Sequence, residues 1–352
     1  MGAPENPPKA PRRRARRRLS IILTAIVLAG LVAFALSRLD LPRIGHALIT
    51  ATPGWIALAF VLMACSLVLR SISWHQTLRA ALPDTRIPRK PVLRATMIGV
   101  LASAVFPGRI GEPSRVLVLT RRLDGPNRRL LPIVAGTVFS QTLINLLALA
   151  ILAAVTFTSV PLLHGRVTGI VTAVAVPAAL CALVLLGPRL LALARRSPWL
   201  RLALAANAIG RMLRLARRGL IVFARPRFGV LAVACQLAAW ALQWLACYAV
   251  MLALGLQGQT GLVSAAAILL AVNVSAVLPA TPSNVGVFQA ACLVVLAAYG
   301  VGAGPSLAYG IILQAVEVLT ALALGVPALL GENLSWGDIR TVSEESAGEG
   351  AQ

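Results

Sequence analysis

The sequence predicts an all-α, polytopic membrane protein, and three observations lead to this fold class. Its 352 residues are 58% hydrophobic and 12% charged, with a mean hydropathy of +0.84, whereas a soluble domain is closer to half apolar and a quarter charged. Apolar runs of about twenty residues, the length of a membrane-spanning helix, recur along the chain. Basic residues cluster between these runs, where the positive-inside rule places them.

The formal net charge of +22 fits a membrane protein better than a nucleic-acid-binding protein. The stretch KAPRRRARRR stands directly ahead of the first apolar run, which is the position of an orientation signal. We therefore expect residues 1–18 to form a basic cytoplasmic tail and residues 331–352 to form an acidic, disordered cytoplasmic tail. The expected location is the cell (inner) membrane, and no nucleic acid is expected as a partner.

Six apolar runs have the length of spanning helices within a membrane domain that we place at residues 19–330. The loop at residues 188–227 is rich in arginine and contains no acidic residue. We expect it to be cytoplasmic and to bind anionic lipid headgroups. The expected spans are residues 19–36, 55–74, 131–157, 167–186, 228–254 and 307–330.

Two similar phrases interrupt the apolar runs: SAVFP at residues 103–107 and SAVLP at residues 275–279. Each is followed by glycine and polar residues and then by a second apolar run. The arms of the first phrase, residues 92–106 and 113–120, are short for spans, and basic residues flank both ends. Uncharged loops flank the second phrase. We interpret the two phrases as re-entrant helical hairpins, the first entering from the cytoplasm and the second from outside.

This interpretation gives the chain an inverted repeat, with halves at about residues 55–157 and 228–330. Many secondary transporters have this architecture, in which broken helices meet near the middle of the membrane and form the binding site. If the two phrases are instead ordinary interhelical turns, the chain has eight spanning helices.

The two predicted hairpin tips contain prolines, which stop one half-helix and start the next, and glycines, which let the backbone approach a ligand. In the second tip we expect Ser283 and Asn284 to cap the following half-helix. The tip residues are Pro107, Gly108, Gly111, Pro279, Pro282, Ser283, Asn284 and Gly286.

Charged residues at membrane depth are the main candidates for function. Arg109 lies in the first tip and Arg115 follows it, and each can grip a lipid phosphate through two hydrogen bonds. Glu112 at that tip and Glu317 in the last span can hold the arginines in place or exchange protons. The alternative for Arg115 is a side chain that snorkels at a cytoplasmic turn.

Four amides lie at membrane depth, where interhelical hydrogen bonding is their commoner use: Gln141, Asn145, Gln289 and Gln314. The five cysteines and three histidines are scattered, without the spacing of a metal site or a disulfide framework. No phosphate-binding loop or dinucleotide motif is found. We therefore expect no cofactor and no metal.

Four segments carry a resemblance to a known family: FPGRIGEPSRVLVL, GTVFSQTLINLLALAIL, LPATPSNVGVFQA and ILQAVEVLTALALGVPALL. Together they resemble the membrane domain of lysylphosphatidylglycerol synthases, which also occurs as free-standing flippase-like proteins. The resemblance implies a lipid-translocating fold with Arg109, Gly111, Glu112 and Arg115 on signature positions. The family often has an arginine and an aspartate where this chain has Gln141 and Asn145.

The leading functional hypothesis is a flippase that moves a phospholipid or polyprenyl-phosphate lipid between leaflets. The alternative is a non-transporting membrane partner of a lipid-linked glycosyltransferase or another cell-envelope lipid enzyme. An enzymatic activity is not expected, because a short acidic tail follows the last apolar run, where the full-length synthases have a soluble catalytic domain.

Overall fold

The computed structural model describes residues 49–105, 111–123, 127–159, 221–276 and 284–331. Within these ranges the chain is helical and contains no strand, which confirms the all-α class. The helices are α3 (Pro53–Ala81), α4 (Arg89–Val105), α5 (Gly111–Thr120), α6 (Asn127–Ser159), α9 (Ile221–Ala224), α10 (Pro226–Ala253), the 3₁₀ turn η2 (Leu256–Gly258), α11 (Leu262–Ser275), α12 (Val287–Ala298) and α13 (Ala303–Leu330).

Four of these helices, α3, α6, α10 and α13, are long and apolar enough to cross a membrane. They coincide with four of the six predicted spans. Helix α3 continues past the predicted end at Trp74, because the polar residues that follow find partners inside the protein. Nε2 of His75 lies 3.0 Å from the carbonyl of Ile87, and Thr77 donates to the carbonyl of Trp74 at 2.7 Å. The predicted spans at residues 19–36 and 167–186 lie outside the described residues.

The two predicted hairpins are present as two pairs of short helices. Helix α4 packs against α5, and α11 packs against α12. The two arms of the second pair have 14 and 12 residues, and at about 1.5 Å per residue each is too short for a hydrocarbon core of about 30 Å. These lengths favour half-helices over the alternative of eight spanning helices.

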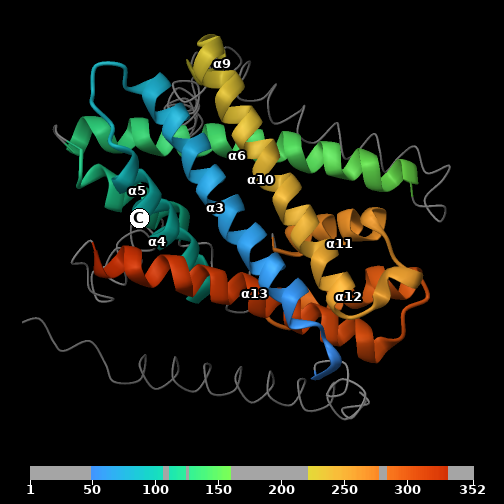
Figure 1. Ribbon diagram of the computed structural model, residues 1–352. Coiled ribbons are helices and arrows are strands. Elements are labelled where there is room, and N and C mark those ends of the chain that lie inside the picture. Colours follow the sequence, from blue (N-terminus) through green and yellow to red (C-terminus); the bar gives the residue numbers. More distant parts are fainter. Residues whose placement is uncertain (1–48, 106–110, 124–126, 160–220, 277–283, 332–352) are drawn as a thin grey trace, which may run out of the picture.

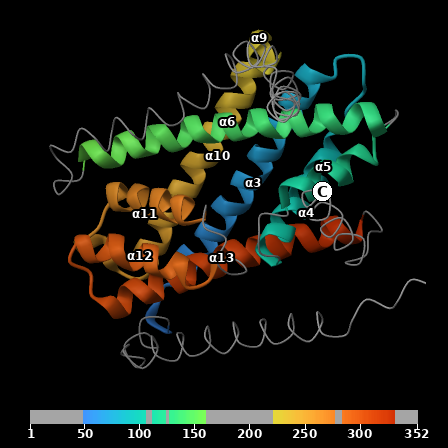
Figure 2. The same ribbon diagram turned by 180° about the vertical axis from the view of Figure 1, so that it is seen from behind.

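The arrangement of the helices is that of two inverted halves. Helices α3 and α10 lie side by side in the middle and run in opposite directions, and α6 and α13 run in opposite directions along opposite sides (Figures 1 and 2). The packing partners repeat when the halves are exchanged: α4 packs on α13 as α11 packs on α6, and α5 packs on α6 as α12 packs on α13. An approximate two-fold axis through the α3 and α10 pair accounts for this pattern.

The buried apolar residues form two main clusters, one around each hairpin. The first contains Trp74 and Leu119 and joins α3, α4 and α5 to the start of α6 and the end of α13. The second contains Tyr309 and Leu296 and joins the helices α10, α11, α12 and α13 to the start of α3. The space between the hairpins lies between these two clusters and is lined by both polar and apolar side chains.

Glycines set the spacing of the first hairpin, where α4 and α5 cross almost backbone to backbone. A Cβ atom at Gly111 would lie 2.0 Å from the carbonyl oxygen of Gly99 and 2.1 Å from Oγ of Ser103. This helix crossing therefore requires the small residue that the sequence interpretation had assigned to ligand approach.

Replacing Gly111 by alanine should destabilise the protein by about 1–3 kcal/mol, because the added methyl group overlaps the backbone of α4 and the two helices have to shift apart. The measurement is thermal unfolding of the purified protein in detergent. Gly54→Ala is the matched control, since nothing lies within 4 Å of a Cβ at that position. Equal midpoints for both variants would show that the two helices separate freely.

The inverted topology predicts which face of the membrane each hairpin enters. In a chain without its native cysteines, Arg89→Cys and Asn127→Cys flank the first hairpin, and Gln257→Cys and Ala303→Cys flank the second. A membrane-impermeant thiol reagent should label the first pair from the cytoplasm and the second pair from outside. Members of one pair on opposite faces would make that hairpin a spanning pair.

Candidate functional site

A cavity of about 450 Å³ lies between the two hairpins, with walls from all four long helices. Four charged side chains line it: Arg70 from α3, Glu112 and Arg115 from α5, and Glu317 from α13. Amides from the second half add hydrogen-bonding groups: Gln243, Asn273, Asn284 and Gln314. The two hairpins and the spans thus bring polar groups from distant parts of the chain to one space.

The lining of the cavity follows the approximate two-fold axis. Arg70 and Gln243 are 173 positions apart, and both line the cavity. The same separation relates the lining residues Gly99 and Val272, Gly111 and Asn284, and Arg115 and Phe288. The cavity therefore lies on the axis. Its chemistry is asymmetric, because the positions that correspond to Arg70 and Arg115 in the other half hold an amide, Gln243, and a phenyl ring, Phe288.

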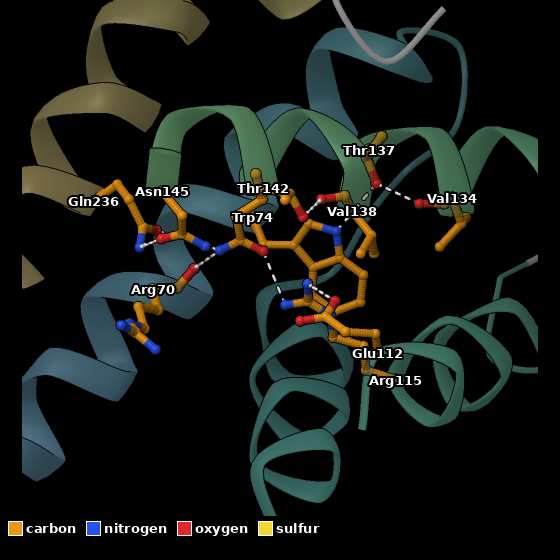
Figure 3. A network of polar contacts seen from close by, with 11 residues as sticks. Arg70, Trp74, Glu112, Arg115, Val134, Thr137, Val138, Thr142, Asn145 and Gln236 are labelled. Carbon is orange, nitrogen blue, oxygen red and sulfur yellow. Dashed lines mark hydrogen bonds and ion pairs between the residues drawn. The ribbon is translucent and has the colours of Figure 1, made fainter. Parts of the chain in front are cut away.

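Arg115 is buried and held by three helices (Figure 3). It forms an ion pair with Glu112 one turn earlier on α5. Its Nη1 donates to Oε1 of Gln141 on α6 at 2.8 Å. The guanidinium also lies over the indole ring of Trp74 on α3, 4.9 Å from the ring centre, and Trp74 donates to Oγ1 of Thr137 at 3.0 Å. Arg115 therefore anchors the first hairpin to its own half.

Gln141 is the centre of the hydrogen-bond network that continues from Arg115. Its Nε2 donates to the carbonyl oxygen of Arg70 at 3.1 Å and to Oε1 of Gln236 at 3.3 Å. Asn145, one turn further along α6, accepts from Gln236 at 2.6 Å and from Trp240 at 3.1 Å. Both amides of α6 are thus engaged in bonds between helices.

The second hairpin is capped differently from the sequence prediction, which placed the cap at Ser283 and Asn284. Gly286 is the N-cap of α12, and its N–H donates to Oε1 of Gln289 at 2.7 Å. Gln289 in turn donates to Gln314 on α13. Asn284 cannot cap at this point because its backbone is left-handed, with φ 57°, two residues before the helix cap. Ser283 lies outside the described residues.

Arg70 is the cavity residue that the sequence interpretation missed. Its Nη2 donates to Oε1 of Gln243 at 2.9 Å, its guanidinium lies 5.8 Å from the ring centre of Trp240, and its Nε is buried without a partner. Figure 3 shows the side chain pointing away from the contacts around Arg115. The available signal was an arginine inside an otherwise apolar span, which is a functional indication in itself.

Glu317 faces the same cavity from the middle of α13 and is half-buried. Among the residues that the structure describes, its carboxylate makes no hydrogen bond and no ion pair. The charge that acts on it is that of Arg70. The two side chains therefore form a pair of opposite charges that share the cavity without touching.

The remaining predicted site residues lie outside the described residues: Arg109, Pro107, Gly108, Pro279 and Pro282. In the described ranges no group of three or more histidine, cysteine or acidic side chains is arranged to hold a metal ion.

Comparison with protein families decides what kind of chain this is. Residues 21–325 match the model of the lysylphosphatidylglycerol synthase TM region. The chain belongs to this family. The matched range contains both hairpins and every residue that lines the cavity. No curated protein matches the chain. Membership in the lysylphosphatidylglycerol synthase TM family indicates a membrane role related to lipids.

In this family member, Gln141→Ala should destabilise the fold by about 1–3 kcal/mol for each buried group left without a partner, because Arg115, Arg70 and Gln236 all bond to that amide. Thermal unfolding in detergent measures the effect. The matched control is Gln257→Ala, whose side chain is exposed. A Gln141 variant as stable as the control would show that the network adds nothing to stability.

Proposed function

We propose that the protein moves a phosphate-bearing lipid, of the phospholipid or polyprenyl-phosphate type, between the two leaflets of the cell membrane. The observation that carries this proposal is the charged cavity between two inverted hairpins. In secondary transporters the substrate binds at such a repeat interface near the middle of the membrane. A cavity of about 450 Å³ is in the usual size range of small-molecule sites, and here it would receive the headgroup.

The arginines support a phosphate group as the part of the lipid that is recognised. A guanidinium binds phosphate oxygens through a planar fork of donors. Both arginines line the cavity and have a buried Nε without a hydrogen-bond partner among the described residues. Arg70 bonds to the neutral amide of Gln243, whereas Arg115 is already paired with Glu112 and bonded to Gln141. We therefore assign Arg70 the first role in phosphate binding and keep Arg109, from the sequence motif of the first tip, as a second candidate. Arg115 and Glu112 position that hairpin.

The packing supports a binding site between the hairpins. Each hairpin is held in its own apolar cluster, and both clusters also contain residues of the opposite half, so the two hairpins are held on opposite sides of the cavity, where the substrate of a secondary transporter binds. We propose that both chain termini are cytoplasmic and that the basic loop at residues 188–227 binds anionic headgroups. A separate lipid-modifying enzyme is the partner that the alternative function would require.

The test is lipid translocation in reconstituted vesicles. Arg70→Ala and Arg109→Ala should abolish transport of a phosphate-bearing lipid, because the phosphate contact is lost. Lysine at either position keeps the charge without the fork and should retain part of the activity. Glu112→Gln should impair transport while the protein stays folded, which size-exclusion chromatography checks.

The matched control is Arg79→Ala, on the same helix as Arg70 but stacked on Phe228 away from the cavity. It should transport at the wild-type rate. Well-folded Arg70→Ala, Arg109→Ala and Glu112→Gln proteins that all transport at that rate would place the lipid path elsewhere. A wild-type protein that moves no lipid would favour the role of a membrane partner.

A further inference from the structure

Among the described residues that line the cavity, Arg70 and Glu317 are the two charges that are not already in an ion pair. Glu112 and Arg115 neutralise each other. Arg70 bonds to a neutral amide and keeps a buried donor without a partner, and Glu317 has no bond to any described residue. Each is the opposite charge that acts most strongly on the other. When the cavity is empty, Glu317 is thus the counter-charge of Arg70.

The other titratable groups around Glu317 are neutral or committed. On the helices that pack against α13, these groups are one thiol on α10 and one thiol on α12. Helix α13 itself contributes a phenol, which donates to a backbone carbonyl. The residues that line the cavity from α4 are uncharged. Thiols and phenols are neutral at physiological pH. The neutral groups are Cys247, Cys292 and Tyr309, and the charged groups that share the cavity with Glu317 are Arg70 and the ion pair of Glu112 and Arg115.

We propose that binding of a phosphate anion to Arg70 is coupled to the uptake of one proton by Glu317. This inference rests on the proposed function and identifies the proton as the ion that is coupled to transport. A phosphate on Arg70 takes over the role of counter-charge and stands beside the carboxylate in a poorly hydrated space. Two like charges sharing such a site cannot both stay ionised, so the carboxylate takes a proton from water on the side to which the cavity is open.

Charge balance gives this coupling a consequence for transport. The empty cavity carries one positive charge on Arg70 and one negative charge on Glu317. A cavity that holds a singly charged phosphodiester and a protonated Glu317 carries the same net charge. Anion and proton therefore move together, and the membrane potential does no work on the loaded form relative to the empty one. A proton gradient then sets the direction of lipid movement.

The experiment is calorimetric binding to the purified full chain in detergent, in two buffers of different ionisation enthalpy and over a range of pH. The probes are dihexanoyl phosphatidylglycerol, inorganic phosphate and uncharged dihexanoylglycerol. Wild-type protein should take up close to one proton per phosphatidylglycerol, and its affinity should fall about tenfold per pH unit once the free protein has lost the proton. Dihexanoylglycerol should show no proton uptake.

Glu317→Gln should bind phosphatidylglycerol without proton uptake and with an affinity that no longer depends on pH. Asp84→Asn is the matched control, because this exposed acid lies in the loop before α4 and does not line the cavity; it should keep the wild-type profile. The proton count on wild-type protein needs no variant, so the inference can be tested even if Glu317→Gln fails to fold.

Binding of phosphatidylglycerol by wild-type protein without proton uptake, or an unchanged pH profile in folded Glu317→Gln, would overturn the coupling and leave the proposed function standing. Proton-linked binding of inorganic phosphate alone would support the coupling and contradict the lipid as substrate. Absence of binding by all three probes at every pH would overturn both.

Discussion

A buried guanidinium has to find partners for its charge and its donors inside the membrane, and most of the site depends on how Arg115 finds them. Water is scarce there, so each missing partner costs several kcal/mol. Arg115 takes a carboxylate from its own helix, an amide from α6 and an aromatic face from α3. These contacts fix where the first hairpin lies against the spans, and the amide of Gln141 continues the network to α10. Nε of Arg115 has no hydrogen-bond partner among the described residues.

The two halves share a backbone plan but not a chemistry. The tight crossing in the first hairpin depends on Gly99 and Gly111, and its tip contains an ion pair. The second hairpin uses a glutamine that caps its own helix and then bonds to α13. An axis through the cavity therefore relates positions, while the residues at those positions differ. The first half gives the cavity two arginines and Glu112, and the second half gives it Glu317 and the amides, with apolar side chains from both halves.

Much of the fold could be predicted because its signals are local. Four described spans follow from the length of their apolar runs, and both hairpins follow from a proline after an arm too short to cross the bilayer. The site depends on partners in other helices, which no local pattern specifies. Arg70 was missed because a single arginine hardly changes the hydropathy of its run. The prediction of the N-cap of α12 was wrong because Asn284 is a residue type that often caps helices. In the structure its backbone is left-handed, and the side chain of Gln289 accepts a hydrogen bond from the N–H of the N-cap residue Gly286 instead.

The distribution of polar contacts bears on how the halves can move. The ion pair of Arg115 and its bond to Gln141 lie within the first half, and the bond between Gln289 and Gln314 lies within the second. Around the cavity, hydrogen bonds join the halves. They involve the side-chain amides of Gln236 and Gln243 and the indole of Trp240. Such bonds are each worth about 0.5–1.5 kcal/mol net, somewhat more where Arg70 takes part, because water can replace them. Under the proposed function the headgroup enters the central cavity, and these hydrogen bonds are the polar contacts between the halves that cost least to exchange there. Glu112 and Arg115 can stay paired during that exchange.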